Sequence, residues 1–195
     1  MYDIHTKKET RITTSKSAGG PSIYGNRIVY GDYRSGVDKS DIYVYDLSTK
    51  KETRITTSKM AYNPNIYGDR IVYQDGRNGD SEIYMYDLST KKETRITKGA
   101  SGFVAKIYGN RIVWEDHRND YGWDIYMYDL STKKETRITT NKSMSEEPNI
   151  YGNTIIWQDD RNENSDIYAY DIVTHQQIHT TNPSGQSVPP YMATK

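Results

Sequence analysis

The chain has 195 residues, and its 26 basic and 26 acidic side chains give a formal net charge of zero. A nucleic-acid binder needs a basic surface that displaces counterions, so this balance argues against that class. There is no cysteine, which excludes disulfides and thiolate metal sites. No run approaches the roughly 18 apolar residues of a membrane span, and no signal segment precedes Tyr2.

Tyrosine dominates the aromatic side chains, with 19 copies against a single phenylalanine. Apolar residues make up only 34% of the chain. A tyrosine ring packs in a core while its hydroxyl stays hydrogen-bonded or wet. The composition therefore predicts a thin, layered core with many half-buried rings.

One segment, Tyr-Asp-Leu-Ser-Thr-Lys-Lys-Glu-Thr-Arg-Ile-Thr, occurs three times without change, at 45–56, 86–97 and 128–139. We call it the twelve-residue word. A nearly identical copy occupies 2–13, and a more divergent copy occupies 170–181. A fixed period of this length indicates one supersecondary unit repeated in tandem.

The first repeat contains four short runs, in chain order 21–24, 27–30, 41–45 and 52–56. The runs are β-branched and aromatic and lack an apolar stripe at helical spacing, so they predict strands. Gly25-Asn26, between the first two runs, is typical of a tight hairpin turn. Successive repeats follow at steps of 43, 41 and 43 residues, measured at Tyr24, Tyr67, Tyr108 and Tyr151.

The third run carries apolar or aromatic side chains on both of its faces. Ile42 and Val44 point one way, and Tyr43 and Tyr45 point the other way. This pattern is typical of a sheet that is covered on both sides.

Four antiparallel strands in a repeat of about 42 residues are the signature of a β-propeller blade. A β-sandwich is the alternative, but it gives no reason for a fixed period. The sequence thus predicts one all-β propeller domain over residues 1–195. Its complete blades are expected at approximately 15–58, 59–99, 100–141 and 142–182.

Both ends of the chain carry part of one further blade. Residues 1–14 match the third and fourth strands of a repeat, and residues 183–195 resemble a first strand. We therefore expect a five-bladed ring whose closing blade combines both ends and lacks its second strand. Such an open edge can pair with another chain, so self-association through this blade is a further hypothesis. The alternatives are a fragment of a larger propeller and an assembly of copies into a larger ring.

Three segments of the repeat resemble those of a known family. They are Arg-Ile-Val-Tyr/Trp-x-Asp-x-Arg-Asn, Asp-Ile-Tyr-x-Tyr-Asp-Leu and Arg-Ile-Thr. They are similar to the TolB-like β-propeller repeat, and closely similar to propeller domains of archaeal cell-surface proteins. The resemblance covers essentially the whole chain and implies the propeller fold. It also implies an extracellular or cell-surface location, although the sequence itself holds no signal peptide.

Successive loops of a meander alternate between the two ends of a blade. The first-to-second turns are almost invariant here, whereas the second-to-third loops and the blade-to-blade loops vary in length and chemistry. Variable loops on a rigid scaffold are a common place for binding sites, although long loops also drift without function. The binding interpretation names six aromatic anchors: Tyr33, Tyr62, Phe103, His117, Tyr121 and Trp123.

An Asp-x-Arg pattern recurs in the second-to-third loop of every repeat. Oxygen ligands for calcium are plentiful there, but the calcium-loop pattern is absent and the arginine would repel a cation. We therefore expect no metal site, and instead expect each arginine to fork onto flanking carboxylates and fix its loop. The acids that follow the pattern are Asp41, Glu82, Asp124 and Asp166. The expected ion pairs are Asp32/Arg34, Asp75/Arg77, Asp116/Arg118 and Asp159/Arg161.

The sequence holds no Gly-x-Ser-x-Gly elbow, phosphate-binding loop or zinc motif, so no catalytic residue is assigned. The leading hypothesis is a non-enzymatic binding or scaffold module for protein–protein contact or adhesion. It needs no cofactor, nucleic acid or membrane insertion. The second hypothesis is a carbohydrate-binding propeller, with Trp123 as the stacking residue because Trp114 and Trp157 occupy core positions. A glycan-active enzyme is the third, since acids are abundant enough for a carboxylate pair.

Overall fold

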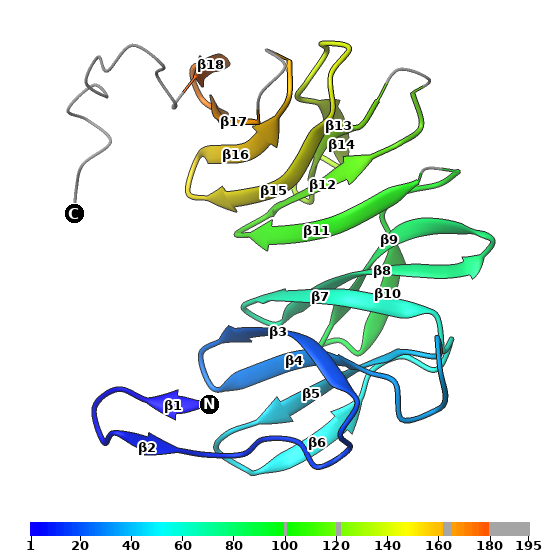
Figure 1. Cartoon of the computed structure of the whole chain (residues 1–195), viewed down its shortest axis with the longest axis vertical. Coiled ribbons are helices and arrows are strands. Elements are labelled where there is room, and N and C mark those ends of the chain that lie inside the picture. The colour runs from blue at the N-terminus through cyan, green and yellow to red at the C-terminus, as the bar shows by residue number, and fades with distance from the viewer. Residues whose placement is uncertain (100, 120–121, 162–164, 180–195) are drawn as a thin grey trace. The chain divides into compact units, whose positions relative to one another are not determined.

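The computed structural model describes residues 1–99, 101–119, 122–161 and 165–179 (Figure 1). In these residues the strands form four sheets of four strands and one sheet of two, and there is no helix. The strands of each sheet are neighbours in sequence order, and they pair antiparallel. The predicted four-stranded antiparallel meander is therefore confirmed.

The first of two compact units, Met1–Ala100, contains a short hairpin followed by two complete blades. The hairpin consists of β1 (Tyr2–Asp3) and β2 (Lys8–Glu9). Blade 1 consists of β3 (Ala18–Tyr24), β4 (Arg27–Asp32), β5 (Asp41–Asp46) and β6 (Lys51–Arg54). Blade 2 consists of β7 (Ala61–Tyr67), β8 (Arg70–Asn78), β9 (Asp80–Asp87) and β10 (Lys92–Arg95).

The second unit, Ser101–Lys195, contains two further complete blades and is described by itself. Blade 3 consists of β11 (Gly102–Tyr108), β12 (Arg111–Asp116), β13 (Asp124–Asp129) and β14 (Lys134–Arg137). Blade 4 consists of β15 (Ser145–Tyr151), β16 (Thr154–Asp159), β17 (Asp166–Asp171) and β18 (Gln176–His179). The expected first strand at 183–195 lies outside the described residues.

The first-to-second turn of each blade contains a glycine with positive φ. Gly25 and Gly68 have φ values of 54° and 60°, and no other group lies within 4 Å of where a Cβ would stand. Glycine adopts this backbone conformation without the steric cost of an L side chain. The turn therefore requires glycine for its dihedral angle and not for space.

The third-to-fourth turns place a lysine in the same region of backbone conformation. In blade 1 the Asp46 carboxylate begins the turn by accepting hydrogen bonds from the N–H groups of Ser48 and Thr49, at 2.9 and 2.8 Å. Lys50 then takes a φ of 54°, and Lys91 and Lys133 each take 56° in their own blades. A side chain in this region is unfavourable by roughly 1–2 kcal/mol.

Replacing Lys50, Lys91 and Lys133 together by glycine is expected to raise the free energy of unfolding by roughly 1–2 kcal/mol. Three steric penalties disappear, and the greater freedom of glycine in the unfolded chain offsets part of the gain. Chemical denaturation measures the change. The control is Lys51→Gly, inside β6, which is expected to lower the same quantity by roughly 0.5–1 kcal/mol. A loss of stability in the triple variant would contradict the expectation.

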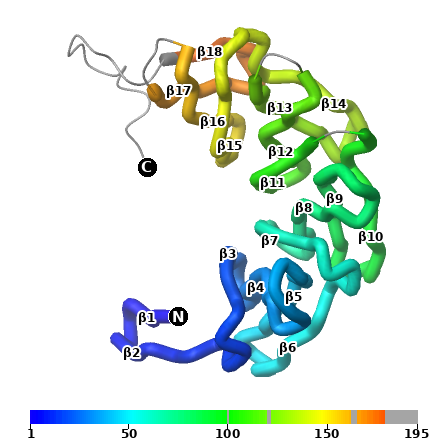
Figure 2. Tube along the Cα trace, turned by 45° about the vertical axis from the view of Figure 1, so that its right-hand side comes forward, coloured from blue at the N-terminus to red at the C-terminus, as the bar shows by residue number. Residues whose placement is uncertain are grey.

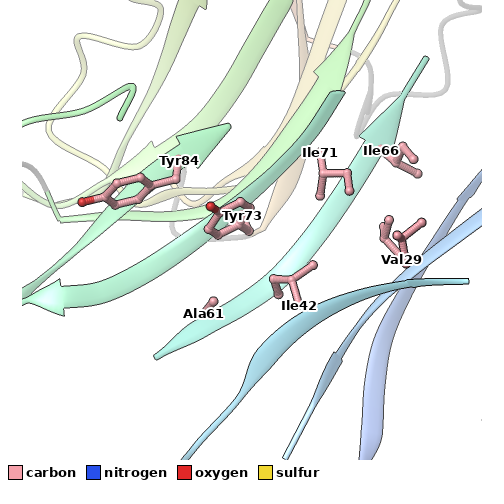
Figure 3. Close-up of a cluster of buried hydrophobic side chains, with 8 residues drawn as sticks. Val29, Ile42, Ala61, Ile66, Ile71, Tyr73 and Tyr84 are labelled. Carbon is pink, nitrogen blue, oxygen red and sulfur yellow. The ribbon is translucent and has the colours of Figure 1, made fainter. Parts of the chain in front are cut away.

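The core of the first unit lies between blades 1 and 2 (Figure 3). Alternate residues of a strand point to opposite sides, so each blade has two faces. We call the face that blade 1 turns toward blade 2 a back face and the face that blade 2 turns toward blade 1 a front face, and we use the same names for the corresponding faces of the other blades. The back face of blade 1 carries Val29, Ile42 and Val44. The front face of blade 2 carries Ala61, Ile66, Ile71, Tyr73 and Tyr84. Both faces of a blade are apolar, as the alternation in the third strand predicts.

Blades 3 and 4 repeat this packing in the second unit. The back face of blade 3 contributes Val113, Ile125 and Met127 to its core. The front face of blade 4 contributes Ile150, Ile155, Trp157 and Tyr168. The same repeat positions therefore build the core in both units.

The hairpin β1–β2 lies in front of blade 1 (Figure 2). Its strands pair Tyr2 with Glu9 and Asp3 with Lys8. Ile12, which follows the hairpin, packs against Tyr30 and other front-face residues of blade 1. Ile55 at the same repeat position packs against blade 2 in the same way. The hairpin thus occupies the place of the third and fourth strands of a blade that precedes blade 1.

Candidate functional site

The loops of each blade gather at its two ends. At one end Asn26 of the first-to-second turn donates a hydrogen bond to Ser48 of the third-to-fourth turn, at 2.9 Å. At the other end Ser17 of the entry segment donates to Asp32, which ends β4 just before the second-to-third loop, also at 2.9 Å. We call this second end of a blade its variable end, because its loops differ among the repeats.

Tyr33 and Tyr62 meet at the variable end in the first unit. Their ring centroids are 6.0 Å apart with a 42° angle between the planes. Tyr33 belongs to the loop of blade 1 and is exposed, while Tyr62 belongs to β7 of blade 2 and is half-buried. The Tyr62 hydroxyl donates a hydrogen bond to the Asp38 carbonyl at 2.9 Å, which ties the loop to the next blade.

Phe103, His117 and Trp123 form a stack at the variable end of blade 3. The ring centroids of His117 and Trp123 are 3.8 Å apart and nearly parallel, and those of Phe103 and His117 are 4.7 Å apart. Burial lowers the pKa of His117 below its ordinary value, which favours the neutral imidazole. Tyr121, the sixth expected anchor, lies outside the described residues.

Each Asp-x-Arg sequence forms a salt bridge between its own two side chains. All four aspartates are buried, and Arg34 also donates its backbone N–H to Asp32 at 2.8 Å. Burial opposes ionisation of Asp159, but hydrogen bonds led by those from Arg161 and Trp157 outweigh it and hold the pKa of that carboxyl below its ordinary value. The distances are 2.8 Å for Arg34–Asp32 and 2.6 Å for Arg77–Asp75, Arg118–Asp116 and Arg161–Asp159.

Each arginine was expected to bind a second carboxylate, from the acid that follows the Asp-x-Arg pattern. In blade 1 the second carboxylate comes from a different residue. Arg34 pairs with Glu52 of β6 at 2.7 Å, and its guanidinium lies 4.1 Å from the centroid of the Tyr43 ring. Asp41, the flanking acid, instead pairs with Arg54. The antiparallel register of β5 and β6 is the reason, because it sets Arg54 opposite Tyr43, close to the start of β5.

The same exchange of partners occurs in blades 2 and 3. Arg77 pairs with Glu93 and Arg118 with Glu135, each at 2.7 Å. Glu82 and Asp124 pair with Arg95 and Arg137. The twelve-residue word supplies both the glutamate and the second arginine, so its invariance was the signal that could have identified these partners. The loops of the variable end are therefore fixed from the fourth strand.

Trp114 and Trp157 are fully buried, at positions where blades 1 and 2 have Tyr30 and Tyr73. Their indole N–H groups donate to Asp116 at 2.8 Å and to Asp159 at 3.1 Å. Tyr73 instead donates its hydroxyl to Glu93 at 2.6 Å. Neither tryptophan offers a free ring face to a ligand, so both act in packing and in orienting the buried aspartates.

Glu115 is a buried acid that the sequence did not single out. It accepts a hydrogen bond from the Glu147 N–H at 3.1 Å, and burial raises its pKa above the ordinary value. The same repeat position holds Gly31, Gln74 and Gln158 in blades 1, 2 and 4. One acid at a position that is otherwise uncharged was the available signal, but its burial depends on the neighbouring blade.

Replacing Glu115 by glutamine is expected to raise the free energy of unfolding at pH 7 by about 1 kcal/mol. The folded-state pKa of Glu115 is raised, so the ionised side chain destabilises the folded chain once the pH exceeds the unfolded value of about 4.3. The gain should therefore grow from about pH 4 upward and vanish below it. Urea denaturation at several pH values measures it, with Glu9→Gln, at an exposed glutamate, as the control. A gain that is independent of pH would contradict this cause.

Among the described residues, no group of three or more histidine, aspartate or glutamate side chains could hold a metal ion. In the same residues no helical segment has the length and hydropathy needed to cross a membrane. The buried carboxylates of the four Asp-x-Arg pairs are all engaged by arginine. What the variable ends offer a ligand is therefore aromatic surface on fixed loops.

Solved structures show which fold these blades share. TolB from Acinetobacter baumannii is 20% identical over 90% of this chain and 46% of its own length, with a TM-score of 0.72. The fold is a TolB-like β-propeller. The putative TolB from Agrobacterium tumefaciens is 17% identical over 93% of this chain and 68% of its own, also at 0.72. The predicted propeller fold is thereby confirmed, and the chain spans about half the length of the Acinetobacter TolB.

The TolB-like fold is shared with proteins of other kinds. The β-propeller domain of the Trilobed protease from Pyrococcus furiosus is 14% identical over 85% of this chain and 57% of its own length, with a TM-score of 0.64. No protein-family model matches this sequence, and a search of curated proteins found no significant match. Because one propeller fold hosts many activities, function has to be argued from this chain's own residues.

Proposed function

We propose that this TolB-like propeller is a non-enzymatic module that binds a protein ligand through the aromatic clusters at its variable ends. The observation that carries the proposal is the Phe103–His117–Trp123 stack, which brings a ring of β11 together with rings from the two ends of the second-to-third loop of blade 3. Aromatic rings give large contact areas for little loss of side-chain freedom, and they are enriched at the centres of protein interfaces. Tyr33 and Tyr62 offer a second such surface in the first unit.

The ion pairs at the base of the loops support this proposal. In blades 1 to 3 the arginine holds a buried aspartate and a fourth-strand glutamate, so the start of each of these loops is held in place before a ligand arrives. A surface that is already ordered binds with less entropy loss than one that must fold on contact. We also propose an extracellular or cell-surface location, which rests on the resemblance of the repeats to archaeal surface propellers.

A peptide display library selected on the full chain tests the proposal. Selected peptides are expected to lose about tenfold or more in affinity for Trp123→Ser or Tyr62→Ser, since each removes a central aromatic contact. The matched control is Val37→Ser, because Val37 is an exposed apolar residue in the loop of Tyr33 that makes no ring contact. Peptides that bind all of these variants equally would place the binding surface elsewhere.

A carbohydrate ligand is the second candidate, and the half-buried Trp123 is the residue that favours it. One face of its ring is stacked on His117, so a sugar could use at most the opposite face. A multivalent glycan array separates the two functions. Binding that Trp123→Ser abolishes would support the lectin function, and an empty array at high glycan density would remove it.

A further inference from the structure

The front face of blade 1 is open, whereas the same face of blades 2 and 4 is covered. Ile23 is 58% exposed, while Ile66 and Ile150 at the same repeat position are 4% and 6% exposed. Pro21 is also exposed, although its counterpart Pro64 is buried. The open face forms a groove of about 810 Å³. Its apolar lining comes from Met1, Ile12, Ala18, Pro21, Ile23 and Tyr30.

The back face of blade 4 is open as well. Ile156 and Ile167 are 41% and 39% exposed. Their counterparts Val29 and Ile42 in blade 1 are fully buried against blade 2. Among the described residues, an apolar front face is thus exposed in the first unit and an apolar back face in the second.

These two open faces are of the kinds that pack together inside each unit. In the first unit the back face of blade 1 covers Ile66 and Ile71 of blade 2. In the second unit the back face of blade 3 covers Ile150 and Ile155 of blade 4. Both observed interfaces join a back face to a front face of this same repeat, so the two open faces match each other in shape and chemistry.

A polar contact accompanies each observed interface. Arg27 of blade 1 pairs with Asp69 in the first-to-second turn of blade 2. Arg111 of blade 3 donates to Asn153 of the corresponding turn in blade 4 at 2.8 Å. At the open faces the arginine position is Thr154, and the turn residue is Asn26. The apolar half of the interface is present there, and only its arginine is lacking.

We propose that the open front face of blade 1 binds the open back face of blade 4 in a second copy of this chain. The second copy's Ile156 and Ile167 then cover Ile23, as Val29 and Ile42 cover Ile66 within the first unit. The interface joins two different surfaces, so association runs head to tail and continues until a ring closes or the chains are exhausted.

The hairpin β1–β2 has to leave this face when the second copy binds. Residues 1–10 are exposed throughout, and each strand of the hairpin has two residues. The hairpin is followed by Ile12, which packs against the buried cluster of this face. A complete blade offers a larger apolar surface than this one side chain, so the exchange is favourable.

Mass measurement by light scattering on the full chain tests the proposal, because one chain has a mass of 22.5 kDa. We expect species of two or more chains whose fraction rises with concentration. Ile23→Lys and Ile156→Lys should each be monomeric, since each places a charge in one half of the interface. Both residues are exposed in the single chain, so the substitutions leave its fold intact. An equimolar mixture of the two variants should recover a species of two chains, because each retains the half that the other lacks.

Further variants separate this interface from other causes of association. Thr154→Arg should strengthen association severalfold by restoring the arginine that blades 1 and 3 carry. Ile12→Ser should also strengthen it, because the hairpin is released more easily. Val173→Lys, at an exposed apolar residue in a turn of blade 4, should change nothing.

Three results would overturn the proposal. They are a wild-type chain that is monomeric at every concentration, an Ile23→Lys variant that still associates, and a mixture of the two lysine variants that stays monomeric. If the wild-type chain is monomeric, the rate at which a thiol reagent labels the Ile23→Cys variant shows why. Slow labelling would mean that residues of the same chain fill the groove, and rapid labelling would mean that the groove is empty. Peptide binding at the aromatic clusters does not depend on these outcomes, so the two proposals fail separately.

Discussion

Replacing Asp159 by alanine is expected to lower the free energy of unfolding by about 3–5 kcal/mol. The Asp159 carboxylate is buried and accepts hydrogen bonds from the Arg161 guanidinium, the Trp157 indole and the Ser145 hydroxyl. Alanine leaves the indole N–H and the hydroxyl buried without an acceptor, and each such group costs about 1–3 kcal/mol. Arg161 remains partly exposed, so water compensates only for the guanidinium. Thermal and urea unfolding measure the loss.

Asp160 provides the matched control, since it is the next residue and is exposed. Its carboxylate accepts one hydrogen bond, from the Met144 N–H at 2.8 Å. Asp160→Ala is expected to lower the free energy of unfolding by about 1 kcal/mol or less. If both alanine variants lost the same stability, the buried position of Asp159 would not be the cause.

The pH dependence of the Asp159 effect has a fixed sign. Hydrogen bonds keep the folded-state pKa of this carboxyl below its ordinary value. Asp159 therefore stabilises the fold fully above its unfolded pKa of about 3.9, and this stabilisation is lost as the pH falls toward the folded value. Asp159→Asn keeps the shape of the side chain but not its charge. The difference in stability between wild type and Asp159→Asn should thus narrow below about pH 4.

The repeat of about 42 residues was sufficient to predict a blade of four antiparallel strands. Strand positions, the glycine turns and the two apolar faces all follow from local pattern, because each depends on residues a few positions apart. Gly25 and Lys50 both have positive φ. A glycine in a turn allows this conformation to be predicted from the sequence, whereas a lysine does not.

The ion-pair partners needed more than local pattern. The sequence showed that Arg34 is close to Asp32, because a single residue separates them. It did not show that Glu52 completes the pair, because the approach of β6 to the second-to-third loop depends on strand register and loop path. Glu115 presents the same limit, since its hydrogen bond comes from the N–H of Glu147 in another blade.

Exposure of the first strand could not be predicted from the repeat at all. Ile23 and Ile66 lie in nearly the same local sequence, Pro-Ser-Ile-Tyr-Gly and Pro-Asn-Ile-Tyr-Gly. Ile66 is buried beneath the back face of blade 1, and Ile23 lines an open groove. The difference arises entirely from what stands in front of each blade.

Replacing Ile66 by alanine is therefore expected to lower the free energy of unfolding by about 2–5 kcal/mol, since it opens a cavity between two packed blades. Ile23→Ala, the same substitution at the same repeat position, is expected to cost about 0.5 kcal/mol or less. Urea denaturation at low protein concentration measures both, so that association through the open faces does not contribute.

The stability costs of Ile23→Ala and Ile66→Ala should also respond differently to protein concentration. If copies associate through blade 1, the cost of Ile23→Ala rises with protein concentration, because binding between folded chains adds to their stability. The cost of Ile66→Ala stays constant, because its cavity lies within one unit. A large cost of Ile23→Ala that is already present at the lowest concentration would mean that the groove is covered within the single chain. The stability cost of the same substitution at the same repeat position therefore reports whether the front face of that blade is covered, and whether the cover comes from the same chain or from another copy.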